Sequence, residues 1–555
     1  MKTKTNMNGG LLALAWAFLM VFVPPPLRAQ FIYQDVYDFD CSIRGCEPQD
    51  NGQLMQWSDG NLYGTTFLGG ANDDGSIFAA TPSVPGGASD VWTFDGITGG
   101  GDPAAALTLA PDGSFYGTTD TGGTFGYGSV FLFTPPGGVK SLIPLHYFNG
   151  TDGQDAETPP IQARDGNFYG VTGSGTTYRV TYPAGAFNQL LGVAPSAPSG
   201  PLVAGLDGNL YGTTFAGGTS NMGTIFKMTT AGAIIILHNF SGTDGATPEG
   251  LVQESDGNLY GTTSSGGANN TGEIFQLTLP GHKLNTLYSF PSVNPSTGQN
   301  SDGAGPLAGL LAASDGYLYG SSGFGGVNAC GTLFRITTKG SFFKLADFPN
   351  WDCSYIGSPE PNSVLVQHTN GSLFGTTYFG GTNGSGNVYT LTPTTPYHTV
   401  KVEGPVWVKP GVPVEILGDN LTHAIQVTFA GEQAQFQAGS DTYLTATVPS
   451  DAVDGLIAVI LDSGLQIESQ SAVRILPVIT NLDPTSGPPG TQVGIAGGGF
   501  AGAKKVTFGG VKATNFTVAS PTLIQAIVPA GARTGKVVVT TPNSSARSKQ
   551  TFTVN

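Results

Sequence analysis

An eight-residue stretch, DGNLYGTT, recurs along the chain and limits the folds that are open to it. It occurs unchanged from Asp59, Asp207 and Asp256, and with small changes from Asp112, Asp165, Asp315 and Asn370. Successive copies lie 42 to 59 residues apart, which gives seven units. Periods of this length belong to propeller blades or long solenoid repeats. The content of one unit decides between these two architectures.

One unit, residues 200–240, contains four apolar or β-branched runs separated by Gly-rich segments. This pattern is typical of a four-stranded antiparallel meander. The Asp-Gly pair predicts a two-residue hairpin between strands one and two, a turn that needs positive φ at both positions. Asn370-Gly371 fills the same place without a carboxylate, so the repeated acids are interpreted as turn residues and not as catalytic groups. We expect the Tyr of the motif, such as Tyr63, to pack between blades.

The N-terminal region supplies a strand that the last unit lacks. The segment FIYQDVYDFD from Phe31 matches the fourth-strand segments of later units, and it precedes the first complete hairpin. The seventh unit has three strands and then continues into TPTTPYHTV. Pairing the first strand with the last unit removes the open edges of the stack. The pattern therefore predicts a closed seven-bladed β-propeller over residues 30–398.

The repeats resemble the GloVer-type tandem repeats of secreted bacterial proteins. The resemblance rests on DGNLYGTTFLGG, DGNLYGTTFAGG and DGNLYGTTSSGG, with GTIFKMT and GTLFRIT downstream, and it covers about 370 residues. It implies an exported, β-propeller-like protein and assigns no reaction. The third copy departs most, because the loop at Gly173–Gly175 is short and should leave a notch in the rim.

The C-terminal part resembles a different family. The segments PVITNLDPTSGPPGTQVGIAGGGF and KVTFGG from residue 477 are similar to IPT/TIG domains, and a less regular copy lies upstream. The resemblance implies immunoglobulin-like sandwiches at 399–476 and 477–555. The expected fold class is therefore all-β, a seven-bladed β-propeller followed by two immunoglobulin-like β-sandwich domains.

The N-terminus and the charge restrict the location and the partners. Lys2 and Lys4 precede an apolar run at 11–23 and a small residue at Ala29, which predicts a secretory signal peptide at residues 1–29. No later segment is long and apolar enough for a membrane span. Residues 30–400 hold 28 acidic and nine basic residues, a net charge of −19, so nucleic acid is an unfavourable partner. A secreted or cell-surface protein with a glycan or protein ligand is expected.

Candidate binding residues lie in loops that the meander brings to one face. Exposed aromatic rings at the exits of second strands would suit sugar stacking, although they could equally fill gaps between blades. The candidate rings are Phe67, Phe215, Phe324, Tyr378 and Phe379. Clustered carboxylates could hold Ca²⁺, the one cofactor considered, although solvated turns also explain them. These acids are Asp73, Asp74, Asp152, Asp155 and Glu157.

The sequence contains no local motif for catalysis. The HExxH, CxxC and GxSxG patterns are absent, and the six His residues are scattered. Two hypotheses remain. The first is a non-catalytic exported binding or structural protein, with the propeller as ligand platform and the sandwiches as spacers. The second is an extracellular carbohydrate-active enzyme, a glycoside hydrolase or lyase, with acids from several blades around one pocket. The oligomeric state is left open.

Four cysteines are present, an even number in a chain with an export signal. Cys330 and Cys353 lie in two loops of the sixth unit that share a face, and Cys41 and Cys46 share the first connecting loop. We predict the disulfides Cys330–Cys353 and Cys41–Cys46. A cross-link between the first and sixth units, or free thiols in a retained protein, are the alternatives.

Overall fold

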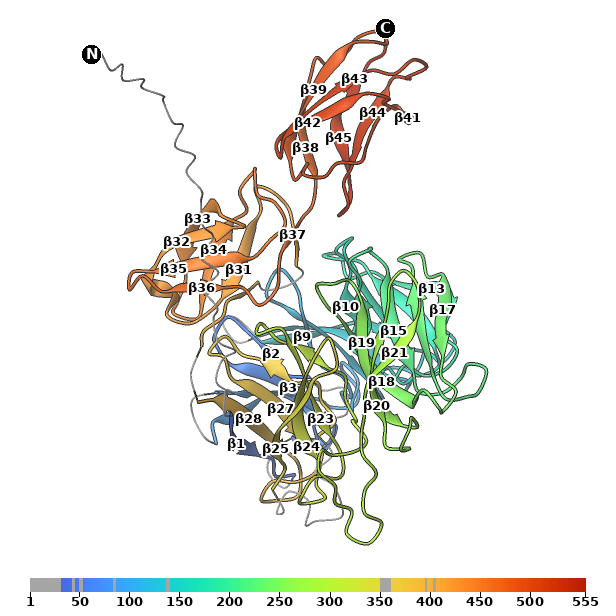
Figure 1. The fold of residues 1–555 in the computed structure, drawn as a ribbon, viewed down its shortest axis with the longest axis vertical. Coiled ribbons are helices and arrows are strands. Elements are labelled where there is room, and N and C mark those ends of the chain that lie inside the picture. The colour runs from blue at the N-terminus through green and yellow to red at the C-terminus, as the bar shows by residue number, and fades with distance from the viewer. Residues whose placement is uncertain are drawn as a thin grey trace, which may run out of the picture.

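The computed structural model describes residues 31–41, 45–48, 53–82, 86–135, 140–349, 361–394, 397–402 and 406–555. Within these residues, seven four-stranded antiparallel sheets form the propeller, and two β-sandwiches follow it (Figure 1). The expected all-β fold class is confirmed. The one helical element described is the short 3-10 turn η1 (Leu421–His423), and no described helix is long and apolar enough to cross a membrane.

Each blade is a meander whose four strands follow one another in the sheet, the last blade excepted. Blade 1 comprises β2 (Met55–Gln56), β3 (Leu62–Thr66), β4 (Ser76–Ala80) and β5 (Ala88–Thr93). Blade 2 comprises β6 (Thr108–Leu109), β7 (Phe115–Thr119), β8 (Ser129–Thr134) and β9 (Ser141–Tyr147). Blade 3 comprises β10 (Ile161–Gln162), β11 (Phe168–Val171), β12 (Thr176–Val180) and β13 (Phe187–Val193). Blade 4 comprises β14 (Val203–Ala204), β15 (Leu210–Thr214), β16 (Thr224–Met228) and β17 (Ile234–Asn239).

The remaining blades keep this order up to the closure of the ring. Blade 5 comprises β18 (Ala246–Gln253), β19 (Leu259–Ser265), β20 (Glu273–Leu277) and β21 (Leu284–Ser289). Blade 6 comprises β22 (Leu311–Ala312), β23 (Tyr317–Ser322), β24 (Thr332–Thr337) and β25 (Phe342–Asp347). Blade 7 comprises β26 (Val366–Gln367), β27 (Leu373–Thr377), β28 (Asn387–Pro393) and the N-terminal strand β1 (Phe31–Asp38).

The N-terminal strand closes the ring as the sequence predicted. β1 pairs antiparallel with β28, from Phe31 opposite Pro393 to Asp38 opposite Asn387. Val36 and Phe39 are buried in a cluster shared with blade 1. The strand therefore completes the last sheet as its outer strand and also packs against the next blade.

The repeated motif builds the hairpin between strands one and two, but not in the predicted form. Of the central pair in blade 1 only Gly60 has a positive φ, and its N–H donates to the Trp57 carbonyl. This geometry is a three-residue loop with Gly in the left-handed position, and the predicted two-residue turn is wrong. The Asp59 carboxylate instead accepts the Asn61 N–H at 2.9 Å, which fixes the turn from its side chain.

The Tyr of the motif is buried between blades and bonded to the motif's own Asp. The Tyr63 hydroxyl donates to Asp59 Oδ2 at 2.7 Å, and its ring contacts Phe115 of blade 2. Burial and the Asp59 carboxylate raise the pKa of Tyr63 above its ordinary range. Corresponding bonds of 2.7–2.9 Å occur at Tyr169, Tyr211, Tyr260 and Tyr319. The motif therefore specifies a turn and a contact between blades.

The Gly that follows this Tyr is required by packing inside its own blade. A Cβ on Gly64 would lie 2.7 Å from the Phe78 ring and 2.9 Å from the Leu54 side chain. The motif glycine in blade 1 thus makes room for an aromatic ring of the third strand.

Two sandwiches follow the propeller. The first has the strand order β29 (Lys401–Val402), β31 (Pro413–Leu417), β34 (Tyr443–Thr447), β33 (Glu432–Ala438), β32 (Ala424–Phe429), β35 (Ile457–Leu461) and β36 (Gln466–Glu468). Two short parallel strands accompany it, β30 (Trp407–Val408) and β37 (Arg474–Ile475). One sheet of the second comprises β38 (Val478–Asp483), β39 (Gln492–Gly498), β43 (Leu523–Ile527) and β42 (Phe516–Ser520). Its other sheet comprises β41 (Val511–Lys512), β40 (Lys505–Phe508), β44 (Gly535–Thr540) and β45 (Ser545–Phe552).

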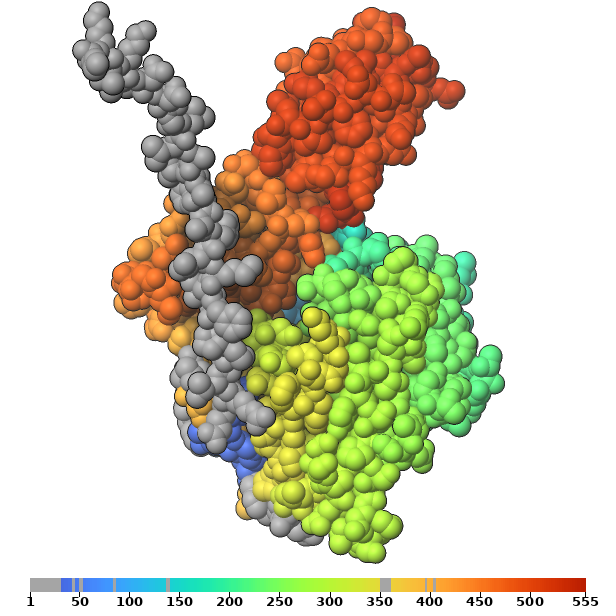
Figure 2. Space-filling view, in the orientation of Figure 1, coloured from blue at the N-terminus to red at the C-terminus, as the bar shows by residue number. Residues whose placement is uncertain are grey.

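The first sandwich is docked on the propeller face that carries the Asp-Gly hairpins, here called the hairpin face. The Thr442 hydroxyl donates to the Ser58 carbonyl, and the Gln470 amide donates to the Gln367 carbonyl at 3.3 Å. The second sandwich projects beyond the first at the far end of the molecule (Figure 2). The opposite face, here called the loop face, carries the loops between strands two and three and those between blades, and it lies at the other end of the propeller.

Candidate functional site

The loop face is built on one repeated backbone contact. At successive blade junctions a residue in the left-handed region accepts, through its carbonyl, the N–H of the residue that leaves strand two. Asp102 is bonded in this way to Asp120 at 3.0 Å, and Asp155 to Gly173 at 2.6 Å. The φ values of Glu47, Asp102 and Asp155 are 55°, 53° and 54°. Non-glycine residues rarely adopt this conformation, so three acidic side chains are held at fixed places around the face.

Asp120 is the most perturbed acid of the loop face. Burial and the carboxylates of Asp155 and Asp102 raise the pKa of Asp120 to about 6. Its Oδ1 is buried and has no hydrogen-bond partner among the described residues. The Thr121 hydroxyl donates to Asp102 Oδ2 at 2.7 Å, so the Asp102 carboxylate has a hydrogen-bond donor within the protein. Asp120 of blade 2 therefore lies near one acid from the connection that enters this blade, Asp102, and one from the connection that leaves it, Asp155.

The rim above this junction is uneven. Residues 120–128 connect strands two and three of blade 2, whereas four residues, 172–175, make the same connection in blade 3. The longer loop exposes Phe125 and Tyr127 to 57% and 41%. A Cβ on Gly150 would lie 3.3 Å from the Tyr127 ring, so this ring leans over the connection that enters blade 3. The short loop expected in the third blade is present, and two exposed rings lie on the longer loop of the blade before it; the notch itself stays a prediction.

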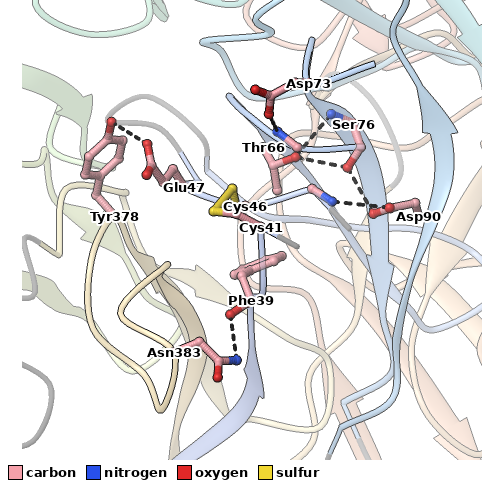
Figure 3. Close-up of a disulfide and its surroundings, with 12 residues drawn as sticks. Phe39, Cys41, Cys46, Glu47, Thr66, Asp73, Ser76, Asp90, Tyr378 and Asn383 are labelled. Carbon is pink, nitrogen blue, oxygen red and sulfur yellow. Dashed lines mark hydrogen bonds between the residues drawn. A yellow bond between two sulfur atoms is a disulfide. The ribbon is translucent and has the colours of Figure 1, made fainter. Parts of the chain in front are cut away.

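The sequence-predicted aromatic residues divide into two groups. Phe215 and Phe324 are exposed, at 55% and 45%, on blades 4 and 6. Phe67, Tyr378 and Phe379 are half-buried, and the Tyr378 hydroxyl donates to Glu47 Oε2 at 2.9 Å (Figure 3). The exposed rings are free to meet a ligand, whereas the half-buried ones also fill space between blades. Their proposed role in binding stays a prediction.

The predicted calcium ligands are dispersed over several loops. Asp73 Oδ1 accepts the Gly69 N–H at 2.9 Å, and burial with the charge of Asp102 raises the pKa of Asp74. The Asp152 carboxylate accepts bonds from His146 and Asn149, while the Asp155 carbonyl accepts the Glu157 N–H. No three His, Cys, Asp or Glu side chains of the described residues gather as a metal-binding group. The calcium site remains a prediction.

One of the two predicted disulfides lies wholly in the described residues. Cys41 and Cys46 are bonded in the first connecting loop, next to Glu47 (Figure 3). The Cys46 N–H donates to the Leu68 carbonyl at 2.8 Å, so the bridge fixes the loop against blade 1. Cys330 is also disulfide-bonded. Its predicted partner, Cys353, lies outside the described residues.

Asp120, Phe125 and Tyr127 were missed by the sequence analysis. A signal for Asp120 was present, because repeat alignment places it at the strand-two exit that holds an aromatic residue in blades 1, 4 and 7. Phe125 and Tyr127 had no such signal, since the tip of the Gly-rich loop varies from unit to unit.

Comparison with protein families identifies the repeats. The model of the Gloeobacter/Verrucomicrobia repeat matches residues 29–191 and 197–403, more than half of the chain. The chain belongs to this repeat family. The IPT/TIG domain model matches residues 477–554, and both matches confirm the resemblances noted in the sequence. No curated protein sequence matches the chain significantly.

Solved structures resemble the chain distantly. A fungal alcohol oxidase of the AA5 family, in complex with copper, is 13% identical, with 80% of this chain and 99% of that chain covered and a TM-score of 0.42. A Bacteroides thetaiotaomicron protein of unknown function is 12% identical, with coverage of 65% and 75% and a TM-score of 0.36. A surface glycan-binding protein from Prevotella bryantii is 18% identical, with coverage of 29% and 43% and a TM-score of 0.21. These resemblances assign neither a reaction nor a ligand.

Proposed function

We propose that this member of the Gloeobacter/Verrucomicrobia repeat family is an exported binding protein whose propeller holds a glycan on its loop face. The observation that carries the proposal is the loop 120–128 of blade 2, which holds the exposed rings of Phe125 and Tyr127 together with Asp120, a carboxyl group near two other acids. Sugar rings offer apolar faces to aromatic side chains and hydroxyls to carboxylates. The first sandwich is docked on the opposite face and leaves the loop face clear, which suits a spacer role for the sandwiches.

Export is supported by the N-terminal segment and by the disulfide. Residues 1–29 have the charge and hydropathy order of a signal peptide. The Cys41–Cys46 bridge joins residues only five positions apart, a kind of bond that persists in oxidising compartments. A secreted or cell-surface location follows from this proposal.

Calorimetric titration with cellohexaose, xylohexaose and mannohexaose tests the glycan site. The double substitution Phe125→Ala, Tyr127→Ala should weaken loop-face binding by about tenfold or more, since each lost stacking contact costs on the order of 1 kcal/mol. The double substitution Phe215→Ala, Phe324→Ala should weaken the binding of a saccharide that is long enough to reach blades 4 and 6. Leu191→Ala is the matched control, because Leu191 is 98% exposed on the outer strand of blade 3. Equal affinity of both double variants and wild type would refute the loop-face site.

A carbohydrate-active enzyme is the second candidate, because of Asp120. A carboxyl group with a pKa of about 6 beside two other carboxyl groups is suited to donate a proton to a leaving oxygen. The enzyme hypothesis predicts shorter products from one of the hexasaccharides, and their loss in Asp120→Asn. Saturable binding without products would leave the binding protein as the function.

A further inference from the structure

A cavity of about 420 Å³ lies between the propeller and the first sandwich. It is on the hairpin face, away from the proposed glycan site. One wall is formed by the hairpin tips of blades 2 and 3 and the other by β30, β31 and the segments beside them. The residues that the argument uses are Pro111, Gln162, Arg164, Tyr182, Trp407 and Glu415. The volume falls in the range of small-molecule sites.

Four blades carry a Gln at the end of the inner strand, and in blades 1, 5 and 7 this side chain accepts a backbone N–H from the hairpin tip of the preceding blade. The Gln253 amide of blade 5 accepts the Leu206 N–H of blade 4 at 2.7 Å, and its own Nε2 donates to the Gly257 carbonyl at 2.7 Å. The same bond occurs at two further junctions, each with an N···O distance of 3.0 Å. Gln56 Oε1 accepts the Thr369 N–H, and Gln367 Oε1 accepts the Ser314 N–H. In these three blades the side-chain oxygen of the inner-strand Gln therefore has a hydrogen-bond donor.

The junction of blades 2 and 3 breaks this rule. Gln162 keeps the bond from its Nε2 to the Gly166 carbonyl at 2.7 Å. Pro111 stands at the position of Leu206 and has no N–H to donate. Gln162 is only 9% exposed, and its Oε1 has no hydrogen-bond partner among the described residues. A buried acceptor without a donor is costly, so this wall of the cavity lacks one hydrogen-bond donor.

The rest of the lining suits a ligand that is apolar on its faces and polar on its edges. Trp407 and Tyr182 bring aromatic surface from the two walls, beside the buried Val408. Arg164 makes no hydrogen bond with the described residues, and burial lowers the pKa of its guanidinium. Glu415 adds an acceptor from the sandwich side. Hydrogen-bond donors and acceptors thus surround an apolar centre.

We propose that this interdomain cavity is a second binding site, for a short neutral saccharide. A ligand hydroxyl supplies the donor that Pro111 withholds from Gln162 Oε1, and a sugar face packs on the Trp407 indole. Oε1 is covered in the free protein, so the exposed Pro111 edge must move outward to admit the hydroxyl. A neutral ligand fits because the charges of the lining balance, with Arg164 and Lys409 against Asp165 and Glu415. The site is independent of the loop-face proposal.

The test restores the missing donor. Pro111→Ala returns an N–H to the position where the regular junctions have one, so it should fold and satisfy Gln162 from within the protein. Titration with the same three hexasaccharides is performed in a background that carries Phe125→Ala, Tyr127→Ala, Phe215→Ala and Phe324→Ala, so that loop-face binding does not contribute. Pro111→Ala and Trp407→Ala should each weaken binding about tenfold, the effect of one lost polar or stacking contact. Leu206→Ala is the matched control and should have no effect.

The outcomes separate the two proposals. Loss of saccharide binding in the background protein combined with binding to wild type would support the loop face alone and overturn the interdomain site. Unchanged affinity of Pro111→Ala and Trp407→Ala would also overturn it, as would selective binding of an extended peptide in place of all three hexasaccharides. Binding in the background protein that both substitutions weaken would support it, whatever the result at the loop face.

Discussion

The two faces of the propeller differ in how closely they follow the repeat. On the hairpin face, the Tyr–Asp bond of the motif recurs in five blades and the bond to an inner-strand Gln recurs in three, and the first sandwich is docked there. On the loop face, loop length, exit residue and exposed rings change from blade to blade. Positions that follow the repeat are used for packing and hydrogen bonding within the propeller. Positions that differ between blades are the ones that can contact a ligand.

Blades 2 and 3 depart from the pattern on both faces. Pro111 removes an interblade bond on the hairpin face, and Asp120 with the short loop 172–175 alters the loop face. The two proposed sites therefore lie at opposite ends of one pair of blades. Four stability measurements test this contrast, beginning with a change that affects both faces.

Deletion of residues 31–40 should have the largest effect. It removes β1 and leaves one edge of β28 unpaired, and it uncovers the apolar surface that Val36 and Phe39 bury. The expected loss exceeds about 5 kcal/mol, since each buried apolar side chain contributes roughly 1.5–3 kcal/mol. Denaturant unfolding measures it, with removal of residues 477–555 as the control that leaves the ring intact. An unchanged unfolding midpoint would contradict closure by β1.

Leu206→Pro should reproduce at blades 4 and 5 the defect found at blades 2 and 3. It removes the donor to Gln253 and leaves a half-buried acceptor unpaired, at a cost of about 1–3 kcal/mol. Pro111→Ala should be close to neutral in the same assay, because the restored bond and the lost rigidity of proline offset each other. A neutral Leu206→Pro would show that this interblade bond does not distinguish the junctions.

Replacement of Cys41 and Cys46 by Ser should lower stability by about 2 kcal/mol, the loop-entropy value for so short a loop. The change lies on the loop face and should leave the hairpin-face docking intact. Thermal unfolding under non-reducing conditions measures the loss, and wild type with reductant provides a comparison. Equal stability of the Ser variant and oxidised wild type would mean that the bridge adds no constraint.

Asp120→Asn should have the smallest effect, and one that depends on pH. The folded pKa of about 6 lies above the ordinary value of 3.8, so wild type loses stability as pH rises between these values and regains none above them. With allowance for solvent screening, the variant should be about 1 kcal/mol more stable than wild type at pH 7.5 and equal to it at pH 3. A constant difference across this range would exclude ionisation of Asp120 as its cause.

Much of the fold could be predicted because its signals are local and repeated. The motif and its spacing predicted the seven blades, and the early fourth-strand segment predicted the partner of β28. The length of the turn was predicted wrongly, because Asp-Gly is compatible with both two-residue and three-residue hairpin loops. The bond from the Asn61 N–H to the Asp59 carboxylate, which fixes the turn, depends on a side-chain conformation that the sequence does not show.

The candidate sites could be predicted only in part. The Cys41–Cys46 bridge and the short loop of the third blade follow from short segments of chain. The pKa of Asp120 depends on acids contributed by two other loops, and the unpaired Gln162 depends on a proline 51 positions earlier. The pattern within one repeat unit does not show which residue of the preceding blade lies opposite Gln162. The N–H that Pro111 lacks therefore leaves no signal in the unit that contains Gln162.

Closure by β1 also fixes the order in which the protein can finish folding. Asp35 bonds to Asn387 across 352 residues, so the earliest strand must wait for the seventh blade before it has a partner. Contacts between such distant residues form late, and incomplete sheets with free edges are prone to aggregate. The six complete blades can form one by one as the chain grows, but the ring becomes resistant to unfolding from its ends only after residue 393 has been made.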